Sequence, residues 1–244
     1  MSDLFEPDLV NKKSYKKHMI IYLVCISIII ILLILYAITS SFVNPWKKYF
    51  ELKEIKTVLT GSIGKNVSNK DFAIDFIKDI YFNFENKHVN TKDSIKKISF
   101  KNIEILDKNG NKPSFNVNVY EKDNNRYLPL NDEQKKLIEY TVKKDNKNLI
   151  LAFRTKKENV AQMEIGSNYE SKQSLSLLKG KIDDKNKDTI NYIVKFDIEV
   201  ELNNGKIFKT EQKIMPDYKY NFDTNIFVKK EDNNLSFERV KIDN

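Results

Sequence analysis

Side chains that perform nucleophilic catalysis or bind metals are scarce in this chain of 244 residues. It contains two histidines, His18 and His88, and one cysteine, Cys25, at widely separated positions. A zinc site needs three or four ligands, and a serine or cysteine nucleophile needs a positioned base, so this set supplies neither. We therefore expect no metal site and no nucleophilic active site, and we interpret His88 as a solvent-facing loop residue.

Three residues have the spacing of a calcium-binding loop. Asp184, Asn186 and Asp188 match the first three ligand positions of such a loop. The pattern then ends, because Thr189 stands where the loop needs glycine and Lys195 where it needs a bidentate glutamate. We interpret these residues as a solvated turn.

The carboxylates are numerous, with 34 Asp and Glu residues, but no spacing singles out a pair of the kind that glycoside hydrolases use. The six glycines form no phosphate-binding motif. The sequence thus predicts a non-enzymatic protein without a cofactor. A hydrolase with paired carboxylates stays open as an alternative.

The elements that would position any site begin with a stretch of 25 uncharged residues, from 19 to 43. About 20 apolar residues in a helix cross the hydrocarbon core of a bilayer, which predicts a transmembrane helix at 19–43. A cleaved signal peptide is disfavoured, because its apolar core spans only about 7–15 residues and because Ala37-Ile38-Thr39 is a poor cleavage site. Cys25 lies in mid-span and is interpreted as a small apolar side chain.

Lysines flank this span on both sides at similar density. Residues 1–18 form a short basic tail that ends close to Lys16 and Lys17, and Trp46 and Tyr49 follow the span. These four side chains are predicted to anchor the chain at the membrane interface. Because long domains are translocated largely regardless of charge, we expect a cytoplasmic N-terminus and an extracytoplasmic C-terminal domain.

The net charge of +8 is spread along the chain without a block of five or more basic residues. A nucleic-acid-binding surface needs clustered basic side chains with interleaved aromatic residues, so no nucleic-acid partner is expected. A mildly cationic surface suits anionic lipid or wall polymer, but a compositional bias toward lysine is the favoured explanation of the charge. The abundance of Lys, Asn and Ile favours an AT-rich genome and a bacterial cell envelope.

Two helices are predicted after the span. Residues 44–61 form the first, a stalk that begins at Asn44-Pro45 and ends at Gly61. Its apolar side includes a candidate interaction surface, for the domain or for a second copy, made of Leu52, Ile55 and Leu59. Residues 68–84 repeat apolar side chains at i, i+4 and i+8, which predicts an amphipathic helix that packs on a sheet.

From residue 94 onward the apolar side chains alternate with polar ones, which predicts strands. Hairpin turns are predicted at Asn109-Gly110 and Asn204-Gly205, and the clearest strand is 190–202. A short helix is predicted at 131–144, and a last hairpin joins 226–228 to 235–237. Helices followed by hairpins define an α+β fold with an antiparallel sheet. Residues 62–244 are read as one extracytoplasmic domain with a candidate internal boundary at 181–188.

This order of elements, a span, a helix at 68–84 and hairpins from residue 94, resembles the bitopic inner-membrane scaffold subunits of type IV secretion and conjugation machines. The resemblance implies a nuclear-transport-factor-like α+β domain, although the run of strands after Asp188 exceeds that plan, and it implies no functional residues. We therefore expect a scaffold subunit of a bacterial envelope complex for secretion, division or motility. Its expected partners are the lipid bilayer, other envelope proteins and a second copy of itself. A membrane-anchored hydrolase of cell-wall polymer and a ligand-sensing ectodomain stay open as alternatives.

Overall fold

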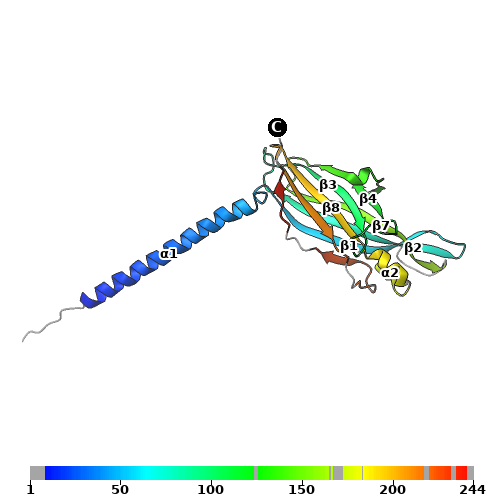
Figure 1. Ribbon diagram of the computed structural model, residues 1–244, viewed down its shortest axis with the longest axis horizontal. Helices are drawn as coiled ribbons and strands as arrows, with labels where there is room; N and C mark the ends of the chain where they lie inside the picture. The colour runs from blue at the N-terminus through cyan, green and yellow to red at the C-terminus, as the bar shows by residue number, and fades with distance from the viewer. Residues whose placement is uncertain are drawn as a thin grey trace, which may run out of the picture. The chain divides into compact units, whose positions relative to one another are not determined.

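The computed structural model describes residues 9–123, 126–164, 166, 173–182, 184–216, 220–231 and 235–240, and within the N-terminal helix it describes the side chains of 18–36. The chain divides into a part that ends at Pro45 and a compact unit, Trp46–Asn244 (Figure 1). The first part contains a long helix, and the second is built mainly from antiparallel strands. The predicted α+β class, with one apolar N-terminal helix, is confirmed.

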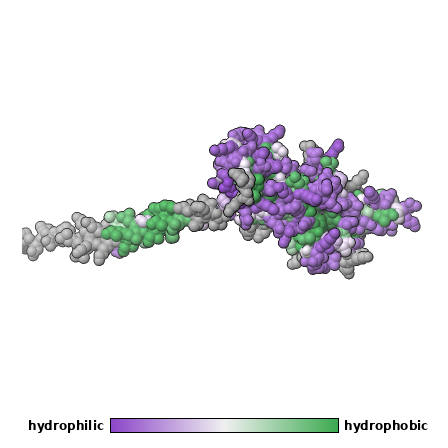
Figure 2. All heavy atoms as spheres, turned by 45° about the horizontal axis from the view of Figure 1, so that its top comes forward, coloured by the Kyte–Doolittle hydropathy of each residue, from purple (hydrophilic) through white to green (hydrophobic). Residues whose placement is uncertain are grey.

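Helix α1 (Leu9–Val43) contains one segment, His18–Tyr36, that is long and apolar enough to cross a membrane. None of this segment is buried in protein, and Figure 2 shows its surface as hydrophobic. The hydroxyl of Ser27 donates to the carbonyl oxygen of Leu23 at 2.8 Å, which satisfies this polar side chain within the helix. A helix that is apolar on every side and unburied is typical of a membrane span.

The strands of the compact unit form two antiparallel sheets. The six-stranded sheet has the order β10–β1–β2–β7–β4–β5, and the five-stranded sheet has the order β11–β9–β8–β3–β6. The strands of the larger sheet are β1 (Phe50–Asn66), β2 (Asp71–Asn86), β4 (Asn118–Asp123), β5 (Arg126–Pro129), β7 (Asn148–Glu164) and β10 (Phe227–Lys230). Those of the smaller sheet are β3 (Ile95–Leu106), β6 (Leu137–Thr141), β8 (Ile193–Leu202), β9 (Ile207–Ile214) and β11 (Glu238–Arg239). Among the described residues, the connections between strands contain three short helical segments, η1 (Gln134–Lys136), η2 (Leu175–Leu178) and α2 (Asp184–Ile190).

The two sheets share one core, which four phenylalanines join at its centre. Phe82 and Phe153 come from the larger sheet, and Phe100 and Phe196 come from the smaller one. The ring centroids of Phe82 and Phe100 lie 4.4 Å apart, and those of Phe153 and Phe196 lie 5.3 Å apart. All four side chains are buried. This packing of aromatic rings fixes the two inner faces against each other.

The helix predicted at 68–84 is strand β2, and the reason lies in its repeat. A spacing of i, i+4 and i+8 fits a period of 2 as well as a period of 3.6, and the residues at i+2 distinguish the two. In β2 these intermediate positions are also apolar, because Ile74 lies between Phe72 and Phe76 and because Phe82 lies between Ile80 and Phe84. The segment therefore presents one row to the core, and this row is apolar from Phe72 to Phe84 except at Lys78.

The stalk helix predicted at 44–61 is also wrong, because these residues lead into strand β1. Its register with β2 shifts between Leu52 and Glu54, where the strand contains a bulge. The extra residue places Leu52, Ile55 and Leu59 on the same inward row with spacings of three and four, which imitates a helix.

Of the two hairpins predicted at Asn-Gly turns, the one at Asn204-Gly205 is confirmed. Strands β8 and β9 pair around Asn204-Gly205, where Gly205 has a φ of 81° and the carbonyl oxygen of Leu202 accepts from its backbone N–H at 3.0 Å. A turn also forms at Asn109-Gly110, but β3 and β4 on either side of it belong to different sheets.

Two further predictions need correction. The last predicted hairpin is likewise divided between the sheets, because β10 pairs with β1 and β11 pairs with β9. The helix predicted at 131–144 is the single turn η1 followed by β6. Residues 181–188, the candidate internal boundary, lie inside one compact unit and contain the start of α2.

Candidate functional site

Five of the predicted site residues lie in the core of the compact unit. At most 6% of the surface is exposed in each of Trp46, Tyr49, Leu52, Ile55 and Leu59. The membrane-interface role of the first two and the interaction surface formed by the other three are therefore corrected. Aromatic side chains that follow a span suit an interfacial belt and a domain core equally well, and here the core holds them. Lys16 and Lys17 lie outside the described side chains.

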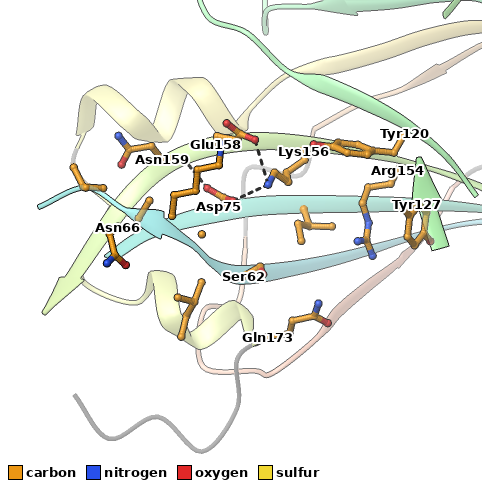
Figure 3. A pocket seen from close by; sticks show the side chains of 16 residues that line it. Ser62, Asn66, Asp75, Tyr120, Tyr127, Arg154, Lys156, Glu158, Asn159 and Gln173 are labelled. Carbon is orange, nitrogen blue, oxygen red and sulfur yellow. Dashed lines mark hydrogen bonds and ion pairs between the residues drawn. The ribbon is translucent and has the colours of Figure 1, made fainter. Parts of the chain in front are cut away.

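A polar groove of about 510 Å³ lies on the outer face of the larger sheet, where β1 and β2 approach their shared turn (Figure 3). Strand alternation explains its lining, because Asp75 of β2 points away from the core while its neighbours Ile74 and Phe76 point into it. The polar side chains that line it include Ser62, Asn66, Asp75, Tyr120, Tyr127, Arg154, Lys156, Glu158, Asn159 and Gln173.

One side of this polar groove is held by an ion pair next to a tyrosine ring. Strand register places Asp79 beside Arg154, and the guanidinium binds the carboxylate through two nitrogens at 2.6 and 2.8 Å. The same guanidinium lies 3.7 Å from the ring centroid of Tyr127. Burial lowers the pKa of Arg154, but its bonds with Asp79 outweigh burial and raise it overall. Burial, aided by the charge of Asp79, also raises the pKa of Tyr127. Both groups therefore hold their protons at neutral pH.

A second set of contacts ties down the floor of the groove. The ammonium group of Lys156 lies 2.9 Å from Asp75 and 3.2 Å from Glu158, as Figure 3 shows. The other oxygen of Asp75 accepts from the backbone N–H of Asn159 at 3.0 Å, in a stretch where β7 bulges and Asn159 has a φ of 53°. Burial lowers the pKa of Lys156, but Asp75 and Glu158 outweigh burial and raise it. Each oxygen of the Asp75 carboxylate thus has a partner.

This arrangement favours binding over proton transfer. Both carboxylates that line the groove are paired with the same ammonium group, so neither is free to act as a general base. Apart from the exposed ammonium group of Lys65 and the guanidinium of Arg154, the remaining polar groups are amides, phenols and a hydroxyl, which donate and accept hydrogen bonds without net charge. The groove therefore suits a polar ligand that offers hydrogen-bonding groups, such as a peptide segment.

The residues considered first for chemistry lie outside this polar groove. His88 contacts the carbonyl oxygen of Lys48 at 2.7 Å, and Asp188 forms an ion pair with Lys108 at 2.8 Å. Within the described part of the chain, no group of three or more His, Cys, Asp or Glu side chains is placed to hold a metal ion.

Sequence reasoning did not single out the groove residues or the adjacent Asp79, because a helix at 68–84 would place Asp75 and Asp79 away from its apolar stripe. The available signal was the row of odd-numbered residues in β2, which carries these carboxylates between apolar neighbours. Arg154 and Lys156 follow the same alternation in β7. Their position opposite β2 depends on strand pairing, which no local pattern records.

The fold and the groove define the class of protein. It has an apolar helix followed by two packed antiparallel sheets, with a polar groove on the outer face of the larger sheet. Comparison of the chain with known protein families, with curated proteins and with solved structures finds no match. Function is therefore argued from the residues themselves.

Proposed function

We propose that this chain is a single-pass membrane protein that acts as a non-enzymatic structural subunit of a bacterial envelope complex, of the kind used in secretion, division or motility. In this proposal helix α1 is the anchor, with the N-terminus in the cytoplasm and the sheet domain outside. The groove, lined by Asp75, Arg154 and Lys156, binds a polar segment of a partner protein. The observation that carries the proposal is the pairing of the groove's carboxylates, Asp75 and Glu158, with Lys156.

The same observation disfavours the hydrolase alternative. A glycoside hydrolase needs one carboxylic acid with a raised pKa and a second carboxylate that is free to attack or to activate water. In the groove Asp75 is held by Lys156 and by the backbone of Asn159. Asp79, the partner of the groove residue Arg154, is held through both oxygens by that guanidinium. Releasing either carboxylate would require breaking a largely buried ion pair.

The proposal does not depend on the resemblance to type IV secretion subunits. That resemblance used a helix at 68–84, and residues 71–84 of this segment are in strand β2. The supports that remain are the exposed apolar segment His18–Tyr36 and the two packed sheets that follow it.

The test is purification of the tagged full-length protein from its native host in mild detergent, with mass spectrometry of the proteins that accompany it. Asn66 is exposed at the rim of the groove, and Asn66→Lys adds a long cationic side chain there. The matched control is Asn111→Lys, which adds the same charge at an exposed turn outside the groove. We expect stoichiometric envelope proteins with the natural chain and with the control, and their loss with Asn66→Lys.

Two results contradict the proposal. If the natural chain purifies without partners, it is not a structural subunit of a stable complex. If Asn66→Lys retains every partner, the groove does not bind them.

A further inference from the structure

Three lysines gather where the chain enters the sheet domain. Lys47 and Lys48 are exposed and directly follow Trp46, and Lys206 comes from the turn between β8 and β9. The Nζ atom of Lys206 donates to the hydroxyl of Tyr49 at 2.6 Å, and that of Lys48 lies 4.9 Å from the centroid of the same ring. The Nζ atom of Lys47 lies 5.6 Å from the ring centroid of Trp46. The buried ring of Tyr49 thus contacts two of these ammonium groups, and the buried ring of Trp46 contacts the third.

A fourth lysine from another segment joins this group. Lys87, just after β2, donates through Nζ to the backbone carbonyl of Lys47 at 2.9 Å. It also forms an ion pair with Glu51 at 3.3 Å. Among the ion pairs of the described residues, none involves Lys47, Lys48 or Lys206. We call Lys47, Lys48, Lys87 and Lys206 the basic collar. Its positive charge exceeds the negative charge of its carboxylate partner, Glu51.

The phenol of Tyr49 responds to this charge. Burial raises the pKa of Tyr49, but the bonds and charges of Lys206 and Lys48 outweigh burial and lower it. A phenol that ionises more easily indicates a positive potential around it, which attracts anions from solution.

The covalent chain keeps the basic collar close to the end of helix α1. Lys47 follows Val43, the last residue of α1, by four residues, and four residues span at most about 14 Å. This limit holds for every orientation of the domain. If α1 crosses a bilayer, the collar therefore stays within reach of the lipid headgroups.

We propose that the basic collar binds the anionic headgroups of the bilayer next to the span, so that the sheet domain rests on the membrane through this end. This inference depends on the membrane anchoring in the proposed function. It gives Trp46 and Tyr49 a different task from the one expected of them, because they lie under the lysines and hold them in place. Each lysine close to an anionic surface favours the bound state about fivefold.

The experiment uses the full-length chain in nanodiscs, either of phosphatidylcholine alone or of phosphatidylcholine mixed with phosphatidylglycerol. An amine-reactive reagent labels the lysines, and mass spectrometry gives the rate at each position. We expect collar lysines to be labelled several-fold more slowly in the anionic discs at low salt, and equally in both discs at high salt, because salt screens the attraction. The exposed distal lysines Lys65 and Lys70 should react equally in both discs. Equal rates for the collar in both discs at low salt would overturn the inference.

A matched pair of triple variants isolates the collar. Lys47→Gln, Lys48→Gln and Lys206→Gln together should reduce the ratio of bound to free domain about 100-fold. The protection of Lys87 in anionic discs should then be lost. The control replaces Lys65, Lys70 and Lys136, which are exposed, with glutamine and removes the same charge. Protection of Lys87 that survives in the collar variant, or that is lost equally in the control, would contradict the inference.

The test separates the two proposals. If the natural chain does not elute with the nanodiscs at all, membrane anchoring fails, and the collar inference fails with it. If the chain elutes with the discs but its collar reacts equally in both lipids, anchoring stands and only the collar inference fails.

Discussion

Replacing Lys78 with methionine should stabilise the domain below neutral pH. Lys78 lies in the inward row of β2 between Phe76 and Ile80, and 1% of its surface is exposed. Its Nζ atom donates to the carbonyl oxygen of Tyr192 at 3.2 Å and lies 4.2 Å from the centroid of that ring. Methionine has a similar length and no charge, so it fills the same space in the core.

Burial lowers the pKa of Lys78 from 10.5 to about 7, although the charge of Glu231 acts in the opposite direction. Between these two values the unfolded chain binds a proton that the folded chain does not, so the free energy of unfolding rises with pH. Below about pH 7 the buried ammonium group lowers the free energy of unfolding by its full effect, which is about 5 kcal/mol for this pKa shift. This destabilisation falls to about 1 kcal/mol near pH 10.

Methionine removes this destabilisation but leaves the carbonyl oxygen of Tyr192 without its donor from Lys78, which costs about 1–3 kcal/mol. We therefore expect Lys78→Met to raise the free energy of unfolding by about 3 kcal/mol near pH 6 and to lower it slightly near pH 10. The difference in the free energy of unfolding between the variant and the natural chain should change by about 4 kcal/mol between pH 6 and pH 10.

The assay is urea unfolding of the full-length chain in detergent at a series of pH values. Trp46 is the single tryptophan and is buried at the start of the domain, so its fluorescence reports the transition. Lys70→Met, at an exposed position, is the matched control and should leave the pH dependence unchanged. A gap between Lys78→Met and the natural chain that stays constant with pH would refute the reasoning, because every other titrating group is common to both.

Three further substitutions test the core and the groove. Phe82→Ala opens a cavity between the sheets and should lower the free energy of unfolding by about 3–5 kcal/mol in urea, and a loss below about 1 kcal/mol would show that this ring does not join the sheets. Arg154→Met leaves the buried carboxylate of Asp79 unpaired and should lower the free energy of unfolding by about 3–5 kcal/mol. Adding Asp79→Leu should recover most of this stability, and equal losses of stability in the single and double variants would argue against a tightly coupled pair. Gly64→Ala places a methyl group 2.8 Å from a carboxylate oxygen of Asp75 and should displace that side chain. We expect it to lower the free energy of unfolding by about 1–3 kcal/mol and to weaken the capture of partners, and unchanged stability and capture would contradict this.

Local patterns were sufficient for some of this fold. The β8–β9 hairpin follows from unbroken alternation on both sides of Asn204-Gly205, a pair whose own backbone preference favours the tight turn. The apolar helix follows equally directly from 25 uncharged residues. In both cases the residues that decide the structure are neighbours in the chain.

Other parts depend on contacts between distant residues. The bulge at Leu52 in β1 gave a strand the spacing of a helix, and only its pairing with β2 identifies it as a strand. The groove depends on the pairing of β2 with β7, which places Asp79 beside Arg154 although they are separated by 75 residues. The identities of the groove residues are visible in the sequence, but their proximity is a property of register.

The length of β1 has a mechanical consequence. Its first residue, Phe50, lies seven positions after the end of helix α1, and Ser62, twelve positions later, borders the groove, so the strand spans about 40 Å between Phe50 and Ser62. A partner that pulls on the groove would load the β1–β2 hydrogen bonds in shear, because these bonds run perpendicular to the strands. Bonds loaded in shear must break together rather than one after another. In the proposed complex, this strand pair would therefore resist extension when tension acts between the partner and the bilayer.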